Sequence, residues 1–453
     1  MANESIHLTR RASLAVLGGA ALLSQSQRVM GANDRVRVAL CGVRGRGLDH
    51  LKNYSKLSNV EIAAICDIDD SVAAKCLATM EKTNLPKPKR YVDIRKLLED
   101  KSIDAISIAT PNHWHALMAI WGCQAGKDVY VEKPCTHNLW EGRQLIASAQ
   151  RYNRVVQHGT QIRSIPVIRE AIQKVHDGYL GDLYMARGVC FKWRDTIGRA
   201  PVEPVPAGVD YELWKGPAPD KPFTRNRFHY NWHWNYLYGN GDLGNQGVHQ
   251  LDVARWALGV GFPTKVSAIG GHFLFDDDQD TPNDLVCAFE FAGPGTKHRM
   301  ISFEVRHWMT NHEAGVGTPD LGARNGNTNS VGDILYGSKG YLSIGDEDTG
   351  AYKAWLGREQ EPQQGAHEND QTAHFRNFID CVISRKKEDL HAPIEEGHMS
   401  ATLMHLANAS YRLGRTIHFN PETQEAIGDA EANVMLRDGA RGYRKPFTIP
   451  EKV

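Results

Sequence analysis

The sequence has no excess of charge of either sign, no internal repeat and no low-complexity tract. Its 453 residues include 53 Lys and Arg against 53 Asp and Glu. Because phosphate recognition depends on a basic excess, this balance argues against nucleic acids and anionic membranes as partners. With 41% hydrophobic residues, the composition is that of an ordinary globular protein. We therefore expect a chain with a sizeable core whose ligand is not a polyanion.

The sequence also lacks the cysteine and histidine patterns of a disulfide framework or a metal centre. None of its eight cysteines forms a C-x-x-C pair, and most have apolar neighbours, so we predict buried core thiols. Histidine pairs occur at His113 and His115 and at His229 and His233, but no carboxylate or thiolate accompanies them at a fixed spacing. We therefore predict no metal site.

The apolar run at residues 12–23 is too short to cross a membrane, which takes roughly 20 residues. Arg10 and Arg11 directly precede it, and this arrangement resembles a twin-arginine signal, the route for proteins that fold around a cofactor before export. The alternatives are an ordinary export signal and a chance pair of arginines. We predict that residues 1–33 are the signal and that the mature protein is periplasmic or otherwise exported. It would fold in the cytoplasm first and keep no stable membrane anchor.

A dinucleotide-binding turn is predicted directly after the signal. The apolar run Val36–Cys41 is followed by a glycine-rich break and an amphipathic stretch. Gly42, Arg44 and Gly47 take the three positions of a G-x-G-x-x-G motif, so the match is imperfect at Arg44. Glycines suit such a turn because backbone N–H groups at a helix N-terminus must approach a pyrophosphate closely.

An acidic residue strengthens this interpretation. Asp67 lies 20 residues beyond Gly47, at the end of a second apolar run, Val60–Cys66. A carboxylate at this place accepts hydrogen bonds from the adenosine ribose and repels a 2′-phosphate. The position therefore favours NAD, with NADP less favoured.

Polar clusters follow two further apolar runs, residues 104–109 and 127–131. Helical patterns separate the runs, which indicates parallel βαβ units whose ligands lie at the carboxyl ends of the strands. Three segments resemble the motifs of the Gfo/Idh/MocA oxidoreductases, the family of glucose–fructose oxidoreductase and inositol dehydrogenase. They are residues 110–112 (Thr-Pro-Asn) with His115, residues 125–127 (Ala-Gly-Lys) and residues 132–134 (Glu-Lys-Pro). The resemblance covers essentially the whole chain after the signal.

The resemblance implies a catalytic role for Lys133, because the lysine of this motif lies beside the nicotinamide and the substrate carbinol in the family. Hydride leaves a secondary alcohol only as the hydroxyl proton is removed or shared, and a neighbouring positive nicotinamide lowers the pKa of an ammonium. We expect NAD to be held by Gly42, Arg44, Gly45, Arg46, Gly47, Asp67, Thr110, Asn112, His115, Glu132 and Lys133.

A second landmark occupies residues 239–256 and resembles the family's G-G-x-x-x-D-x-x-x-H-x-x-D segment. His249 takes the histidine position, and Asn245 replaces the preceding aspartate, one helical turn away. Since an amide cannot carry a proton, the proton-handling role is expected to pass to His249 and Lys133. Asp252 either orients the imidazole or pairs with Arg255.

Aromatic and hydrogen-bonding side chains crowd the stretch between the two landmarks. Sugars are bound by such mixtures, because ring C–H faces pack on aromatic planes while hydroxyl groups take hydrogen bonds. We predict substrate contacts from Arg163, Trp193, Arg194, His229, Trp232, Tyr236, Asn245 and His249.

The predicted architecture has two domains after the signal. Residues 34–155 form an α/β Rossmann domain with a parallel sheet. Residues 156–453 form an α+β substrate-binding and oligomerisation domain, in which alternating runs at 284–291 and 300–305 indicate a large, mostly antiparallel open-faced sheet. By analogy with the family we expect a homodimer or homotetramer.

These observations predict an NAD-dependent oxidoreductase that acts on a secondary hydroxyl of a sugar, glycoside or cyclitol. Because an exported protein has no external NAD pool, we expect the NAD to stay tightly bound and to be recycled internally. The alternative is an NAD-assisted glycosidase, in which oxidation, elimination, water addition and reduction give no net redox change. A non-enzymatic sugar-binding protein is disfavoured by the presence of Lys133 and His249.

Overall fold

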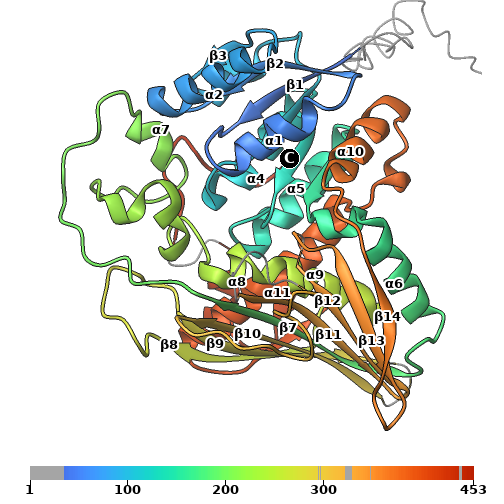
Figure 1. Cartoon of the computed structure of the whole chain (residues 1–453). Coiled ribbons are helices and arrows are strands. Elements are labelled where there is room, and N and C mark those ends of the chain that lie inside the picture. The colour runs from blue at the N-terminus through green and yellow to red at the C-terminus, as the bar shows by residue number, and fades with distance from the viewer. Residues whose placement is uncertain (1–34, 294, 296, 322–328, 347, 438–440) are drawn as a thin grey trace, which may run out of the picture. The chain divides into compact units, whose positions relative to one another are not determined.

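The computed structural model describes residues 35–293, 295, 297–321, 329–346, 348–437 and 441–453. Val36–Val453 form one compact unit (Figure 1). The predicted export signal lies outside the described residues. Within the described ranges, no helix combines the length and the apolar character that crossing a bilayer requires.

The first half forms a six-stranded parallel sheet in the order β3-β2-β1-β4-β5-β6. Strands and helices alternate along the chain, as predicted for βαβ units, and the sheet lies at the top of Figure 1. The elements are β1 (Val36–Cys41), α1 (Arg46–Tyr54), β2 (Val60–Cys66), α2 (Asp70–Lys82), β3 (Lys89–Tyr91), α3 (Ile94–Leu98), β4 (Ala105–Ile108), α4 (Asn112–Gln124), β5 (Asp128–Glu132), α5 (Leu139–Arg151) and β6 (Val156–Gly159).

The second half contains a ten-stranded sheet in the order β14-β13-β12-β11-β7-β10-β9-β8-β15-β16. β7 and β10 pair in parallel, and the other neighbours pair antiparallel, which confirms the predicted mostly antiparallel sheet. Its strands are β7 (Leu183–Lys192), β8 (Lys265–Gly271), β9 (Asp284–Ala292), β10 (His298–His307), β11 (Ser330–Gly337), β12 (Gly340–Gly345), β13 (Ala351–Leu356), β14 (Glu361–His367), β15 (Ile417–Asn420) and β16 (Glu425–Ala426).

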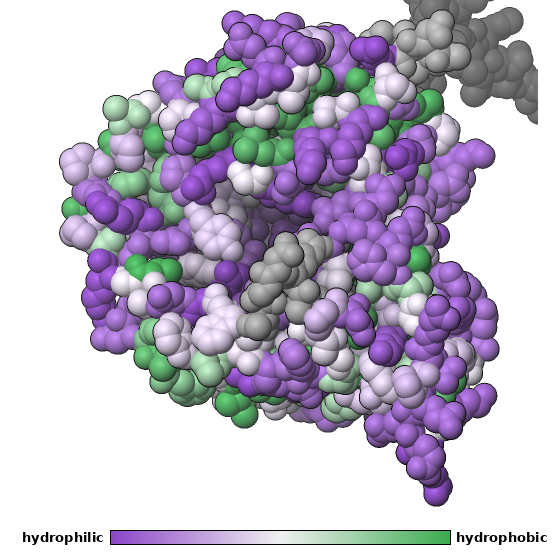
Figure 2. Space-filling view, in the orientation of Figure 1, coloured by the Kyte–Doolittle hydropathy of each residue, from purple (hydrophilic) through white to green (hydrophobic). Residues whose placement is uncertain are grey.

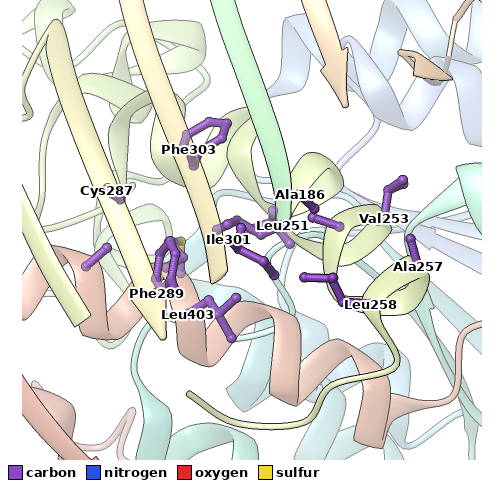
Figure 3. Packing of buried hydrophobic residues seen from close by; sticks show 14 of the residues in the cluster. Ala186, Leu251, Val253, Ala257, Leu258, Cys287, Phe289, Ile301, Phe303 and Leu403 are labelled. Carbon is purple, nitrogen blue, oxygen red and sulfur yellow. The ribbon is translucent and has the colours of Figure 1, made fainter. Parts of the chain in front are cut away.

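Helices cover the face of this sheet that is turned towards the parallel sheet (Figure 1). The α-helices of the second half are α6 (Pro166–His176), α7 (Tyr211–Lys215), α8 (Gly241–Asn245), α9 (Gly247–Leu258), α10 (Thr372–Ser384), α11 (Ile394–Leu413) and α12 (Ala430–Arg437). The short 3₁₀ helices are η1 (Gln161–Ser164), η2 (Arg225–Arg227), η3 (His229–Trp234) and η4 (Lys387–Asp389). Side chains of α9 and α11 interlock with those of β9 and β10, as Figure 3 shows for Leu251, Leu403, Phe289 and Ile301. This apolar layer fixes α8 and α9 beneath the parallel sheet.

A long segment of the second half, residues 202–238, runs back over the first half, and we call it the strap. It contains α7, η2 and η3, and it is seen at the left of Figure 1. Backbone hydrogen bonds attach it to the end of β2: Asp70 N–H donates to Gly208 O at 2.9 Å, and Asp210 N–H donates to Ile68 O at 2.9 Å. Its own aromatic core comprises Tyr211, Trp214, Phe223, Phe228 and Tyr238.

Candidate active site

A cavity of about 360 Å³ lies at the carboxyl edge of the parallel sheet. Its walls come from the glycine-rich turn, the loops after β2, β4 and β5, the strap, and Asn245 at the end of α8. The face of the molecule in Figure 2 is hollowed between the two sheets and is mostly hydrophilic around the hollow. The cavity therefore occupies the place where ligands bind in open parallel sheets.

Most of the predicted cofactor-binding residues meet in this cavity, although they come from four separate segments. They are joined there by three of the predicted substrate-binding residues. The predicted residues that line it are Gly42, Arg44, Gly45, Arg46, Asp67, Thr110, Asn112, His115, Glu132, Lys133, His229, Trp232 and Asn245.

The glycine-rich turn has the shape that a pyrophosphate requires. A Cβ at Gly42 would lie 2.8 Å from Ala109 O, and one at Gly47 would lie 2.0 Å from Gly42 O, so both positions need glycine for packing. Gly45 precedes α1 with φ at 45°, and no atom lies within 4 Å of its ideal Cβ. Open space thus faces the N-terminus of α1, where N–H groups and the helix dipole favour an anion. A dinucleotide fits this arrangement.

Two carboxylates follow β2. Asp67 accepts hydrogen bonds from Val43 N at 2.8 Å and from Asp69 N at 3.0 Å, and burial raises its pKa. Asp69 caps α2 by accepting from Ser71 N at 2.8 Å, and its other oxygen lies 3.3 Å from His229 Nε2. This end of the cavity is therefore acidic, which favours ribose hydroxyls over a ribose phosphate.

Lys133 lies directly after β5 on the cavity wall. Its Nζ donates a hydrogen bond to Asn245 O at 2.5 Å, so the ammonium is held against the last residue of α8. The Asn245 side-chain amide donates to Asp242 Oδ1 at 3.0 Å. A lysine on a cavity wall can hydrogen-bond a substrate oxygen as the ammonium, and it can accept a hydroxyl proton once it is the neutral amine.

His233 is a cavity residue that the sequence interpretation did not select. It lies in the strap, and both Lys133 and Arg194 are close enough to act on its charge. Its Nδ1 lies 2.5 Å from Tyr230 O, and because a carbonyl can only accept, Nδ1 carries the proton and Nε2 is an acceptor. Removal from water and the nearby cations lower its pKa to about 3, so the ring is neutral at pH 7. Its place in the sequence between Trp232 and Trp234 was the only signal.

The structure does not bring His249 to the cavity. His249 is buried on α9, and a break at Gln246, with φ at −114°, separates α9 from α8. Asn245 and His249 are therefore not successive turns of one helix, contrary to the expected spacing. Asp252 accepts two hydrogen bonds from Arg163, at 2.7 and 3.0 Å, and its Oδ1 lies 3.9 Å from Arg255 Nη2, the ion pair that the sequence offered as one of its two roles.

Other predicted substrate residues also lie outside the cavity lining. Arg163 is held in the ion pair with Asp252. Arg194 forms an ion pair with Asp242, and Tyr236 lies between Arg412 and Arg441. Trp193 follows β7 and is exposed, and its ring centroid lies 6.2 Å from that of Trp308. His229 does line the cavity, but it lies beside Asp69 among the predicted cofactor residues.

In the part of the chain that the structure describes, no three side chains of His, Cys, Asp or Glu are grouped to hold a metal ion. All eight cysteines are buried.

Two family models match the chain. A model of the oxidoreductase family with an NAD-binding Rossmann fold matches residues 36–160, and a model of the family's C-terminal alpha/beta domain matches residues 167–269 and 360–448. The chain belongs to the Gfo/Idh/MocA oxidoreductase family. NAD is the cofactor of the Rossmann fold in this family, in agreement with the cavity described above.

Curated relatives match a shorter part of this Gfo/Idh/MocA chain. A glycosyl hydrolase family 109 protein of Shewanella pealeana is 38% identical over 122 residues, which are 26% of this chain and 27% of the relative. The chain thus aligns with about a quarter of the length of the curated relatives it matches.

Solved structures share the fold over nearly their full length. Levoglucosan dehydrogenase, solved with NADH and levoglucosan, has a TM-score of 0.63 at 16% identity, covering 87% of this chain and 100% of that structure. The aldose-aldose oxidoreductase of Caulobacter crescentus, solved with glycerol, has a TM-score of 0.62 at 18% identity, covering 85% and 100%. At these identities the likeness establishes the fold.

Proposed function

We propose that the protein is an NAD-dependent oxidoreductase that acts on a secondary hydroxyl group of a sugar, glycoside or cyclitol. The observation that carries this proposal is the position of Lys133, whose Nζ donates from the wall of the cavity that contains the glycine turn and Asp67. The structural neighbours solved with levoglucosan and with glycerol, both polyhydroxy compounds, support the substrate class.

In this proposal NAD supplies the hydride acceptor. Lys133, as the neutral amine, accepts the substrate hydroxyl proton as the C–H bond breaks and becomes the ammonium. The Asn245 carbonyl orients the Lys133 ammonium, and neutral His233 offers an acceptor on the same wall. Trp232 supplies an aromatic surface for a sugar ring.

We further propose that NAD stays bound between turnovers. The strap contributes Trp214, Phe228 and the η3 residues to the cavity wall, while its backbone is tied to β2 and α4. His113 Nε2 lies 2.9 Å from Trp214 O, which adds a buried attachment. Release of a dinucleotide then requires the strap to detach, so a second substrate would have to return the hydride.

An NAD-assisted glycosidase is the second candidate, and the 38% identity to glycosyl hydrolase family 109 proteins favours it. Such an enzyme oxidises a hydroxyl, eliminates the aglycone, adds water and returns the hydride. It needs a second base near the neighbouring carbon, and His233 places an unprotonated ring nitrogen on the cavity wall.

One experiment separates the two reactions. The protein is purified without added cofactor, and its reduced-nicotinamide absorbance is followed during incubation with a panel of sugars and aryl glycosides. Reduction that stops after one turnover supports the oxidoreductase. Release of free aglycone without net reduction supports the glycosidase instead. Lys133→Ala is expected to abolish either reaction, and unchanged turnover would remove Lys133 from the mechanism.

We also propose export by the predicted signal and assembly into a homo-oligomer. Arg10 and Arg11 before the apolar run support export. On the face of the ten-stranded sheet opposite the helices, Ile269 and Val286 lie opposite each other and are 77% and 54% exposed. Exposed apolar side chains on an uncovered sheet face are consistent with a subunit contact. Fractionation of expressing cells and light scattering of the purified protein test these two proposals.

A further inference from the structure

The Glu132 carboxylate is held by several groups that have no part in the reaction proposed above. Arg46 Nε donates to its Oε1 at 2.8 Å, and Gln161 Nε2 donates to the same oxygen at 3.0 Å. Its Oε2 accepts from Lys133 N at 3.2 Å. Burial alone would raise the pKa of Glu132, but the Arg46 charge and the His50 hydrogen bond outweigh burial and hold the pKa well below its ordinary value. Glu132 is therefore an anion beside Lys133.

His50 orients this anion without adding charge. Its Nε2 lies 3.0 Å from Glu132 Oε1, and its Nδ1 lies 2.9 Å from Ser107 Oγ. Because an ionised carboxylate can only accept, Nε2 carries the proton and Nδ1 accepts from the Ser107 hydroxyl. Burial lowers the pKa of His50, which keeps the ring neutral.

The carboxylate has little room to move. A Cβ at Gly159, on the neighbouring strand β6, would lie 3.0 Å from Glu132 Cδ. Arg46 is the first residue of α1, directly after Gly45 of the phosphate-binding turn. The Arg46–Glu132 ion pair therefore joins that turn to the strand end that carries Lys133.

The titratable groups that face Lys133 come from three elements. Glu132 belongs to β5, His115 to α4 and His233 to η3, and each interacts electrostatically with Lys133. On α8 the facing group is the Asn245 carbonyl, which is neutral. Burial lowers the pKa of His115, and His233 has a pKa of about 3, so both rings are uncharged at pH 7.

Formal charges near Lys133 are thus arranged in pairs. Glu132 is paired with Arg46, and Asp242 is paired with Arg194 behind His233. The first pair is the nearer one in the chain, because Glu132 is the residue before Lys133 and bonds its backbone.

We propose that Arg46 and Glu132 are positioning residues for Lys133. Their ion pair fixes the strand end, and their opposite charges set how readily the Lys133 ammonium gives up its proton. This inference rests on the proposed role of Lys133, but its test needs no substrate. Occupation of the turn by an anion would engage Arg46 as well, so the same pair would link cofactor binding to the state of Lys133.

The test measures the titration of Lys133 directly. The protein as purified is labelled with a trace of acetic anhydride at a series of pH values, and the acetylation of Lys133 is quantified by peptide mass spectrometry. Exposed Lys96 on α3 serves as an internal reference in every sample. The variants are Glu132→Gln, Arg46→Met, the double variant, and the conservative Arg46→Lys, each checked for folding by circular dichroism.

Glu132→Gln removes the anion, so the labelling midpoint of Lys133 is expected to fall by about one pH unit. Arg46→Met removes the opposing cation, so the midpoint is expected to rise, while the double variant and Arg46→Lys stay near the wild type. A merely structural role would give no shift, or shifts in the same direction for both single variants, and either result overturns the proposal. If Glu132→Gln does not fold, the contrast between Arg46→Met and Arg46→Lys decides. If the wild type is inactive on sugars but the Lys133 labelling midpoints of the two single variants shift in opposite directions, the proposed function is wrong and this inference stands.

Discussion

The strap makes cofactor retention open to a quantitative test through Phe223. This side chain is 5% exposed and packs against Tyr211 and Phe228 with ring centroids 5.3 Å away in both cases, yet it does not line the cavity. Phe223→Ala should cost about 3–5 kcal/mol of packing. If that loss falls on the attachment of the strap, the detached state becomes more populated by about 100-fold to a few thousand-fold, because 1.4 kcal/mol is tenfold.

The assay follows NAD(H) loss from the purified holoenzyme after rapid dilution, with reduced-nicotinamide fluorescence as the signal. Phe419→Ala is the matched control, since Phe419 is 1% exposed but belongs to the core of the second half. We expect Phe223→Ala to accelerate NAD(H) release and Phe419→Ala to lower global stability without this effect. Equal release rates for the two variants would refute the idea that the strap retains the cofactor.

Three further predictions concern single side chains. Asp67→Ala should weaken NAD binding by about tenfold, because the carboxylate that accepts from the ribose hydroxyls is lost. NADP binding should weaken less, because the repulsion between Asp67 and the 2′-phosphate is lost as well. Titration calorimetry with both cofactors measures this, and equal losses of affinity contradict the ribose role. Arg163→Met should lower the free energy of unfolding in urea by about 3 kcal/mol, because the buried Asp252 loses two hydrogen bonds from Arg163 and keeps Ser400 and the more distant Arg255, with NAD affinity unchanged. His374 has a pKa of about 3 because of burial, so it stabilises the fold fully above pH 6.5 and loses that contribution as the pH falls towards 3. Between pH 7.5 and 4.5 the free energy of unfolding of the wild type should therefore fall by about 3 kcal/mol more than that of His374→Gln. If the two proteins lose the same free energy over this range, the imidazole is not buried in its neutral form.

The first half of the fold could be predicted closely because its signals are local. Val36–Cys41 and Val60–Cys66 are strands with the predicted bounds, since a strand buried on both faces is a continuous apolar run. Asp67 and Lys133 come to one cavity because parallel strands end at the same edge. For the ten-stranded sheet, only its mostly antiparallel character could be predicted. The order of its strands could not, because β7 pairs in parallel with β10, more than a hundred residues away in the sequence.

The substrate side of the site depended on long-range packing, and there the sequence was a weaker guide. Asn245 and His249 have helical spacing, but the helix is interrupted at Gln246, and Asn245 alone of the two is among the residues that line the cavity. Arg163 and Arg194 are of a residue type that binds sugars, but each is held in an ion pair with a buried aspartate far away in the sequence. His233 lies at the cavity because the strap folds back over the first half, and the local sequence pattern does not indicate this long-range contact.

The strap also has a consequence for the order in which the protein matures. Residues 36–160 contain the glycine turn, Asp67 and Lys133, but the cavity wall is not complete until the chain has been extended through the strap and on to Asn245. During synthesis, the nascent first half can thus display a phosphate-binding turn without enclosing a dinucleotide. Loading of NAD therefore waits until the chain has been extended past its midpoint. If the proposed export of the folded protein holds, loading precedes departure from the cytoplasm.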